Sequence, residues 1–573
     1  MTTGDLILGG LRGLHMAALS LAAGVMLVSL LAGRRVGPGA RPFLAGALVT
    51  GVLWLVWQAG AVTGQGFPQA QWLLLSGTGF GRAMAARIGL LLLALVLGRW
   101  GFLPLLAAIG LQPLLGHGAA AEWPVTLSGG SHALAGALWA GALPWLWLLA
   151  RSEPGVARRF SPVGVLLVLI LGGGSVGQWP LIGGLPGLFG TTHGHLLLAK
   201  AGLLVVMLAC AGLNGLWFAP GWPKALRRSL RVEMAAGGLA ILLAALAAGQ
   251  VPGAHDAVVW PFGWRPAPGL WQDDFLRGRL VRMAAPLGLA GALVLVALVA
   301  LRQARILALA LVLTAVGLVW RMPVFPAAPF LRPALPTSFQ MADTRRNTVS
   351  LAAGQALFAR DCAGCHGAYA QGAGPLATGD PVWPPDLTAP WFLGTNDGDW
   401  FWRIRHGMTT AQGQPSMPGD PALSDAEIWQ VIDFLRANAS ARSLDAGGRW
   451  LIPPVAPVIR LRCEGRAGAI DLSRPKGGAS WRAVYWGPDL MRGPMPEGVL
   501  QLAPDLCVAQ DDKGIREAIT LLAAGRADGR AGLLVDASGH LRQIWTSPPD
   551  AGALASAMEY VIANPVSTMG RHH

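Results

Sequence analysis

The pattern of apolar positions divides the chain into two regions. Between residues 11 and 320, long apolar runs with few charges follow one another, whereas residues 337–573 mix apolar and polar positions as soluble domains do. A helical run of about 17 to 25 apolar residues can cross roughly 30 Å of hydrocarbon. The first region therefore predicts an all-α polytopic membrane bundle of about 8 to 10 transmembrane helices. The ten runs are 11–33, 43–63, 81–98, 101–117, 127–150, 162–182, 196–218, 231–250, 280–300 and 304–320.

Basic residues occur in alternate loops between these runs. Three of the loops between them, 64–80, 118–126 and 183–195, contain no Lys or Arg. Since basic loops stay in the cytoplasm, we expect the N-terminus and everything after residue 321 to lie outside. The net charge of +14 is then explained by topology, without a nucleic-acid partner. The first apolar run lacks a preceding basic segment and is interpreted as a signal anchor. The basic residues are Arg34, Arg35, Arg41, Arg99, Arg151, Arg158, Arg159, Lys224, Arg227, Arg228, Arg231, Arg302 and Arg305.

A Cys-x-x-Cys-His motif follows the membrane region, at Cys362, Cys365 and His366. Two thiols on one helical turn can form thioethers with the vinyl groups of haem, while the adjacent imidazole reaches the iron. A thioredoxin-like dithiol or half a zinc site is the alternative for Cys-x-x-Cys. The flanking sequence favours haem, because an amphipathic stretch over 349–358 precedes the motif and an apolar helix over 428–435 follows it.

Met417-Pro418-Gly419 lies about fifty residues after the motif. This order resembles a class I cytochrome c, which implies His366 and Met417 as axial ligands of one covalent haem c. Met408 is the competing ligand. With both axial positions filled, the haem would transfer electrons rather than activate a substrate. The sequence therefore favours an electron-transfer protein over a stand-alone enzyme. Covalent haem attachment outside the cytoplasm agrees with the predicted topology, in a bacterial inner membrane with these domains in the periplasm.

Six histidines precede the motif, and the predicted spans place all of them at or near the outer membrane boundary. A single boundary histidine is usually a hydrogen-bonded interfacial residue. Six in one leaflet suggest ligands, because imidazole binds copper and haem, and polar groups at membrane depth are costly without a partner. They are His15, His117, His132, His193, His195 and His255.

Several motifs together resemble the CopD copper-resistance family over roughly residues 100–440. The resemblance implies copper handling, either movement of copper across the membrane or its delivery there. His193 departs from it, because a tyrosine is common in the family at this place. The segments are Ser131-His132-Ala133-Leu134, Leu138–Leu143, Arg158–Ser161, Thr192–Lys200, Leu213-Asn214, His255–Phe262 and Pro336–Phe339.

Two further ionisable residues lie at the ends of predicted spans. We interpret Lys200 as a side chain that extends to the outer interface. Glu233 follows Arg227, Arg228 and Arg231 and is interpreted as a paired structural charge.

The C-terminal sequence predicts strands over 482–486, 531–535 and 541–545 and helices over 514–523 and 552–562. This order resembles the second half of a thioredoxin-like α/β fold, although Trp486-Gly487-Pro488-Asp489-Leu490 stands where a dithiol is expected. Cys463 and Cys507 are predicted to form a disulfide, with a metal pair or free thiols as alternatives. The predicted organisation is a membrane domain at 1–321, a Pro-rich linker at 322–346, a cytochrome c domain at 347–445 and the thioredoxin-like domain at 455–566.

The combined prediction is a membrane protein that couples extracytoplasmic electron transfer to copper handling, with an unidentified redox partner. One alternative is a respiratory subunit in which the histidines hold haem b and a quinol supplies electrons. Another is a passive anchor with structural histidines.

Overall fold

The structure is a computed structural model in which the chain divides into two units, each with its own packed core. The first unit contains Met1–Val258 and Gly278–Phe325, and the second contains Val259–Arg277 and Pro326–Arg571. The described residues are 3–35, 38–149, 152–214, 223–266, 274–300, 305–321, 330–342, 347–379, 382–393, 395–456, 461–463, 481–486, 507–509, 512–527, 531–536, 538–547 and 549–564.

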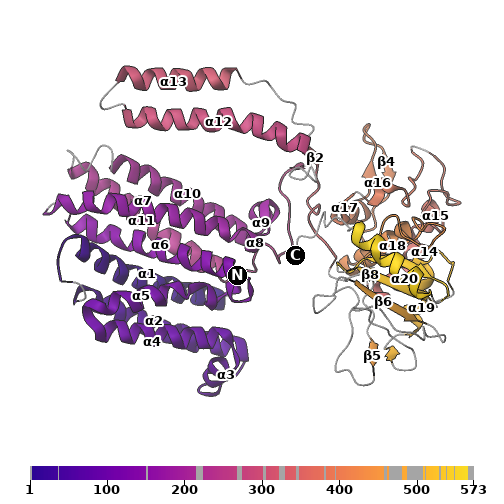
Figure 1. Cartoon of the computed structure of the whole chain (residues 1–573), viewed down its shortest axis with the longest axis horizontal. Coiled ribbons are helices and arrows are strands. Elements are labelled where there is room, and N and C mark those ends of the chain that lie inside the picture. The colour runs from indigo at the N-terminus through magenta and orange to yellow at the C-terminus, as the bar shows by residue number, and fades with distance from the viewer. Residues whose placement is uncertain are drawn as a thin grey trace. The chain divides into compact units, whose positions relative to one another are not determined.

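The first unit is a bundle of apolar helices, most of which run roughly parallel to one another (Figure 1). Among the described residues, seven helical segments are long and apolar enough to cross a membrane. The chain is therefore a multi-pass membrane protein. The main helices are α1 (Thr3–Leu31), α2 (Arg41–Thr63), α3 (Gln69–Gly77), α4 (Gly79–Leu97), α5 (Phe102–Gly110), α6 (Trp123–Leu149), α7 (Pro154–Gly177), α8 (Trp179–Ile182), α9 (Gly184–Gly190), α10 (Thr192–Leu213), α11 (Pro223–Ala247), α12 (Asp274–Ala300) and α13 (Arg305–Trp320).

The count of ten expected spans is not reached. Runs 81–98 and 101–117 were expected to cross separately, but α5 has only nine residues and is about 13.5 Å long, too short to cross. It folds back along α4, where Arg87 Nε donates to the Ala108 carbonyl at 2.9 Å. Ile306–Trp320 is a shorter apolar helix, and α12 is not among the seven spans found in the described part. The length of an apolar run therefore reports hydropathy alone. Whether its helix crosses the membrane depends on where the chain turns.

The cytochrome-like part of the second unit is helical. Helix α14 (Thr348–Asp361) packs against α18 (Asp425–Ala441). A Cβ on Gly354 would lie 1.9 Å from the Gln430 carbonyl oxygen, so only glycine allows this close crossing. Ser424 and Glu427 form a capping box that fixes the start of α18. Between these helices lie α15 (Ala363–His366), α16 (Pro390–Leu393), α17 (Asp397–His406) and a ribbon of β3 (Met408–Thr409) and β4 (Pro415–Met417).

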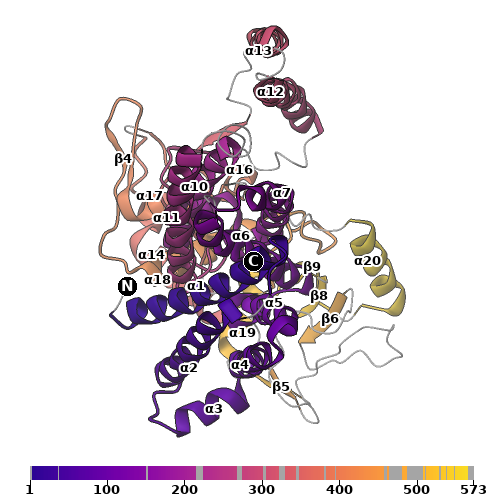
Figure 2. The same ribbon diagram turned by 90° about the vertical axis from the view of Figure 1, so that its left-hand side faces the viewer.

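The C-terminal elements lie where the sequence predicts them. Antiparallel strands β6 (Trp481–Trp486), β8 (Ala531–Asp536) and β9 (Leu541–Trp545) form one sheet in the order β6-β8-β9 (Figure 2). Helices α19 (Asp512–Leu522) and α20 (Ala551–Ala563) pack against residues of β8. Strands β5 (Leu461–Cys463) and β7 (Cys507–Ala509) pair antiparallel with Cys463 opposite Cys507, the register that a disulfide between them requires. The disulfide and the thioredoxin-like assignment stay predictions.

The cytochrome-like helices and the C-terminal elements share one hydrophobic cluster. Leu351 of α14 and Ala437 of α18 belong to the same buried group as Ile519 of α19 and Leu533 of β8. Trp450, between the two parts, donates from Nε1 to the Leu522 carbonyl at 3.2 Å. Residues 444–455 form isolated bridges, two of them with residues 540 and 543, so the segment between the predicted cytochrome c and thioredoxin-like domains is built into this unit. Of the predicted Pro-rich linker, residues 322–329 and 343–346 lie outside the described residues.

Candidate haem centre and membrane histidines

The Cys-x-x-Cys-His motif forms one compact turn. Helix α14 ends where the Cys362 amide donates to the Phe358 carbonyl at 2.9 Å, and the His366 amide then donates to the Cys362 carbonyl at 2.9 Å. Both thiols, Cys362 and Cys365, are free and partly buried. The following loop is held against this turn, because the Leu376 amide donates to the Gly364 carbonyl at 2.7 Å. Two thiols and an imidazole therefore leave the same helical turn, the donor set that covalent haem attachment needs.

Burial shifts the pKa values of the thiol and the imidazole in this turn. It raises the pKa of the Cys362 thiol to about 12, and the carboxylates of Asp361 and Asp420 act in the same direction. Burial also lowers the pKa of His366, while its interaction with the Pro385 backbone opposes that change. Burial therefore favours the neutral imidazole, the form that has a free lone pair.

The geometry around the two candidate methionines differs. Met417 and Met408 face each other in the register of β3 and β4, but Met417 is partly buried against the apolar cluster that also contacts Cys362. Met408 is 37% exposed. Gly407 has φ 75°, and a Cβ there would lie 2.5 Å from the Met417 carbonyl oxygen. Glycine thus allows the turn that brings Met417 over the core. The apolar cluster, the paired thiols, His366 and Met417 fit a covalent haem.

The structure does not gather the six histidines into one site. In the described part, no group of three or more His, Cys, Asp or Glu side chains is placed to hold a metal ion. His193 Nδ1 lies 3.1 Å from the Ala247 carbonyl and His195 Nε2 lies 2.7 Å from the Phe189 carbonyl. His255 lies in an exposed turn after α11, and the side chain of His117 lies outside the described residues.

The placement of the six histidines at the outer boundary stays a prediction. His15 and His132 each lie nine residues after the start of a candidate span, at Leu6 and Trp123, or about 13.5 Å along the helix axis. Helices α1 and α6 begin earlier than the apolar runs suggest.

His132 is held by contacts on both ring nitrogens. Its Nδ1 lies 3.1 Å from the Leu171 carbonyl and 3.0 Å from Ser175 Oγ, both on α7. A carbonyl only accepts, so Nδ1 donates and Nε2 carries the lone pair. Lys200 Nζ lies 3.1 Å from that Nε2. Lys200 therefore turns toward His132 rather than extending to the interface, which corrects our interpretation.

Two other buried charges have unexpected surroundings. Glu233 accepts a hydrogen bond from Asn214 Nδ2. The arginines that precede it by two, five and six residues are not its neighbours on the helix surface, where residues three and four apart are adjacent. Arg87 is fully buried and was missed, although an arginine well inside an apolar run was a signal for it. Its Nη1 donates to Gln112 Oε1 at 2.9 Å.

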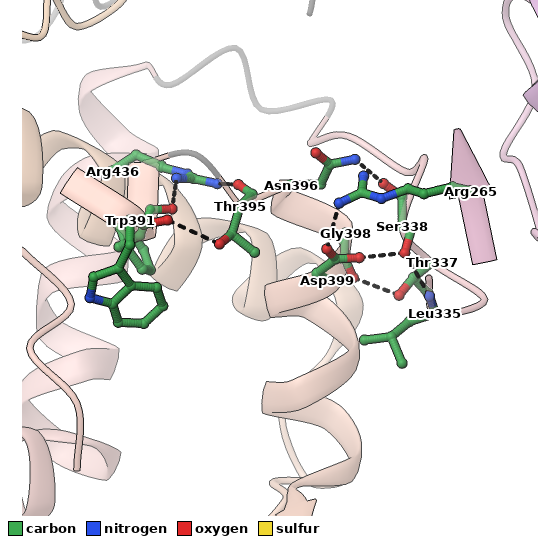
Figure 3. A network of polar contacts seen from close by, with 11 residues as sticks. Arg265, Leu335, Thr337, Ser338, Trp391, Thr395, Asn396, Gly398, Asp399 and Arg436 are labelled. Carbon is green, nitrogen blue, oxygen red and sulfur yellow. Dashed lines mark hydrogen bonds and ion pairs between the residues drawn. The ribbon is translucent and has the colours of Figure 1, made fainter. Parts of the chain in front are cut away.

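A buried polar network links the segment before α12 to the cytochrome-like part (Figure 3). Arg265 of β1 (Trp264–Pro266) pairs with Asp399 of α17 at 3.1 Å, and Ser338 Oγ donates to the same carboxylate. Thr337 Oγ1 donates to the Gly398 carbonyl at 2.6 Å. β1 also pairs antiparallel with β2 (Leu331–Pro333). The segments before α12 and after α13 thus meet at the start of α17.

The Trp-Pro-Phe and Pro-Thr-Ser-Phe motifs belong to the same arrangement. The Trp260 amide donates to the Pro336 carbonyl at 2.8 Å, and the Trp260 ring lies edge-on to Phe339 with centroids 4.8 Å apart. These motifs therefore help to attach the segments before α12 and after α13 to α17. The spacing of the motifs in the sequence did not reveal this role.

Comparison with known families agrees with this geometry. Residues 1–127 match the copper resistance protein D-like N-terminal domain, and residues 154–247 match copper resistance protein D. Residues 349–435 match cytochrome c oxidase, cbb3-type, subunit III. The chain joins CopD domains to a cytochrome c domain. The resemblance inferred from the motifs is thereby confirmed, and the cytochrome c domain implies covalent haem c. No curated protein and no solved structure matches the chain significantly.

Proposed function

We propose that this CopD-cytochrome c protein is a mono-haem electron carrier of the bacterial inner membrane that exchanges electrons with copper handled by its membrane domain. The observation that carries the proposal is the fusion of CopD domains with a cytochrome c domain in which one turn offers two thiols and His366, and β4 carries Met417. When bound, haem c supplies a one-electron Fe(III)/Fe(II) couple. Met417 as the second ligand favours the reduced iron relative to a second histidine.

The protein's own residues define the rest of the proposed chemistry. His366 would supply its imidazole to the iron, and the apolar cluster around Met417 would shield the haem from water. Copper is the substrate: one electron reduces Cu(II) to Cu(I). The softer Cu(I) prefers the sulfur of Met and Cys, whereas Cu(II) tolerates imidazole and oxygen ligands. The copper candidates in the membrane remain His15, His117, His132, His193, His195 and His255, each as a separate position rather than as one cluster.

Loss of covalent haem tests the first half of the proposal. Cys362→Ser with Cys365→Ser should abolish haem staining on a denaturing gel while leaving the protein in the membrane, because the thiols are remote from the spans. A stained band of unchanged intensity in the double variant would refute the assignment.

Metal analysis tests the second half. The purified protein should contain copper and one haem, and mixing its reduced form with Cu(II) should oxidise the haem with stoichiometric formation of Cu(I). His132→Ala with His195→Ala should lower the copper content and leave the c-haem spectrum unchanged. A second, non-covalent haem that disappears in this variant would favour the quinol-oxidising alternative. Absence of both copper and extra haem would favour the passive anchor.

A further inference from the structure

The two halves of the membrane domain carry the same sequence pattern at equal spacing. Thr78 and Gly81 precede Arg87, and Gly89-Leu90-Leu91 follows it. The same order recurs 113 residues later as Thr191, Gly194, Lys200 and Gly202-Leu203-Leu204. On the first helix of each half a histidine precedes a glycine by nine residues, as His15 with Gly24 and His132 with Gly141.

The recurring threonines and glycines have the same structural roles. Thr78 Oγ1 accepts from the Gly81 amide at 3.0 Å and donates to the Leu74 carbonyl at 2.6 Å. Thr191 Oγ1 accepts from the Gly194 amide at 3.0 Å and donates to the Gly187 carbonyl at 2.6 Å. A Cβ on Gly81 or Gly194 would meet these same carbonyl oxygens at 2.1 and 2.2 Å. Helices α4 and α10 therefore begin in the same way.

The first helices of the two halves, α1 and α6, cross each other at the equivalent glycines. A Cβ on Gly24 would lie 1.9 Å from the Gly141 carbonyl oxygen, and a Cβ on Gly141 would lie 1.8 Å from the Ser20 carbonyl oxygen. Such a near-reciprocal contact is what a two-fold relation between the halves produces. Parallel repeats of this kind build many membrane transporters.

Both histidines are fixed by the second helix of their own half. His15 Nδ1 lies 2.9 Å from the Ala47 carbonyl and 3.3 Å from Thr50 Oγ1 on α2. His132 Nδ1 has the matching carbonyl and hydroxyl partners on α7. In each half Nδ1 therefore carries the proton, and the Nε2 lone pair is left for another partner. Helix α4 in the first half and helix α10 in the second half each supply a basic side chain near this histidine. Arg87 lies within electrostatic range of His15, and Lys200 contacts His132 directly.

The basic side chains differ in how they are anchored. Arg87 is held by the Ala108 carbonyl and Gln112, and His15 Nε2 has no hydrogen-bond partner among the described residues. Lys200 has His132 Nε2 as the one hydrogen-bond partner that the described part of the chain gives it. Lys200 can thus leave its histidine by rotating its own flexible side chain, whereas Arg87 is bound to its own helical hairpin.

We propose that the membrane domain is an internal duplication and that the Lys200 amino group occupies, on His132 Nε2, the position that a soft monovalent cation such as Cu(I) takes in the second half. This inference rests on the copper handling of the proposed function. Imidazole offers a single lone pair at Nε2, so the amino group and a metal ion exclude each other there. Cation binding at His132 then requires Lys200 to withdraw, and the equivalent His15 serves as an internal control.

Silver(I) binding to the haem-loaded full-length protein tests the inference. Ag(I) resembles Cu(I) but is redox-silent, so the result is independent of electron transfer. Lys200→Leu should raise Ag(I) affinity at one site by about 10- to 100-fold, the factor that one charged hydrogen bond represents. Lys200→Arg, which keeps a donor at Nε2, should give no increase. Lys200→Ala serves as the second variant if Lys200→Leu fails to accumulate with normal haem content.

Matched double variants locate the site. The increase should disappear in Lys200→Leu with His132→Ala and persist in Lys200→Leu with His15→Ala. Unchanged affinity in both folded Lys200 variants, or an increase that survives His132→Ala, would overturn the inference. Failure of the reduced haem to exchange electrons with copper, combined with the Ag(I) increase, would instead defeat the proposed function and leave this site in place.

Discussion

At the scale of single residues, the haem turn and the membrane histidines follow opposite principles. His366 and the two cysteines are neighbours in the chain, so one helical turn brings their side chains together. His132 and Lys200 are 68 residues apart and meet only because α6 and α10 belong to one bundle. A buried polar pair of this kind is costly to break, because each group then loses its partner in a medium without water.

The first prediction at this scale concerns the sixth ligand of the iron. Met417→Ala should keep the haem attached but remove the weak sulfur-to-iron charge-transfer band and lower the midpoint potential, because the thioether stabilises reduced iron. Redox titration and the absorption spectrum of the oxidised protein measure both effects. Met408→Ala is the matched control and should preserve the band. If the band is lost from the Met408 variant instead, the ligand assignment is wrong.

A second residue-scale prediction concerns Asp536, which is buried at the end of β8. Burial alone would raise the pKa of this carboxyl, but hydrogen bonds from His540 and Ser538 outweigh burial and hold the pKa well below its usual range. A folded-state pKa below the unfolded value means that the carboxylate stabilises the fold above about pH 4, and that this stability is lost as the pH falls further.

Acid unfolding of the C-terminal part should therefore begin below about pH 4 and depend on Asp536. Asp536→Asn should lower its stability at neutral pH by about 1 to 3 kcal/mol and weaken the acid dependence. Hydrogen exchange of strands β8 and β9 measures both. Glu517→Gln, on the exposed side of α19, is the control and should change neither. An acid transition of the Asp536 variant identical to that of the wild type would contradict the electrostatic explanation.

At the scale of elements, the buried Arg265–Asp399 pair controls how the segments around α12 and α13 attach to α17. Both side chains are less than 10% exposed. Asp399→Asn leaves the guanidinium without its counter-charge, and we expect a loss of about 3 to 5 kcal/mol of stability in this unit. Arg265→Met with Asp399→Leu should cost less, because no buried charge is left unpaired.

Thermal unfolding followed by haem absorbance compares these variants. Asp425→Asn is the control, because it removes an ion pair to Arg405 in which the Asp425 carboxylate is 78% exposed. This substitution should lower the stability by no more than about 1 kcal/mol. Equal losses for Asp399→Asn and Asp425→Asn would show that the buried pair does not hold the attachment.

At the scale of the whole molecule, the distribution of basic residues predicts the orientation. Reporters fused after Arg159 and after Arg305 should read as cytoplasmic, whereas fusions after Gln65 and after Pro336 should read as external. Alkaline phosphatase and fluorescent-protein fusions, which are active on opposite sides, provide the measurement. External activity after Arg159 would overturn the orientation and with it the periplasmic position of the cytochrome c domain.

The sequence alone determined the features that local pattern controls. Apolar run length set most of the membrane helices, and the Cys-x-x-Cys-His spacing identified the cytochrome c domain, because each depends on residues within a few helical turns. The C-terminal strands and helices also followed from alternation and turn residues. The motifs Arg158–Ser161 and Thr192–Lys200, which suggested the resemblance to CopD, lie within the residues that match copper resistance protein D.

The tertiary structure alone decided which distant groups meet. It turned α5 back along α4, placed Lys200 on His132, gave Glu233 the partner Asn214, and joined Arg265 to Asp399 across 134 positions. Periodicity cannot specify such pairs, because it records which face of a helix is polar but not which helix lies opposite that face. Among the described residues it also brings no three His, Cys, Asp or Glu side chains together as a metal site, which the positions of the histidines along the chain could not decide.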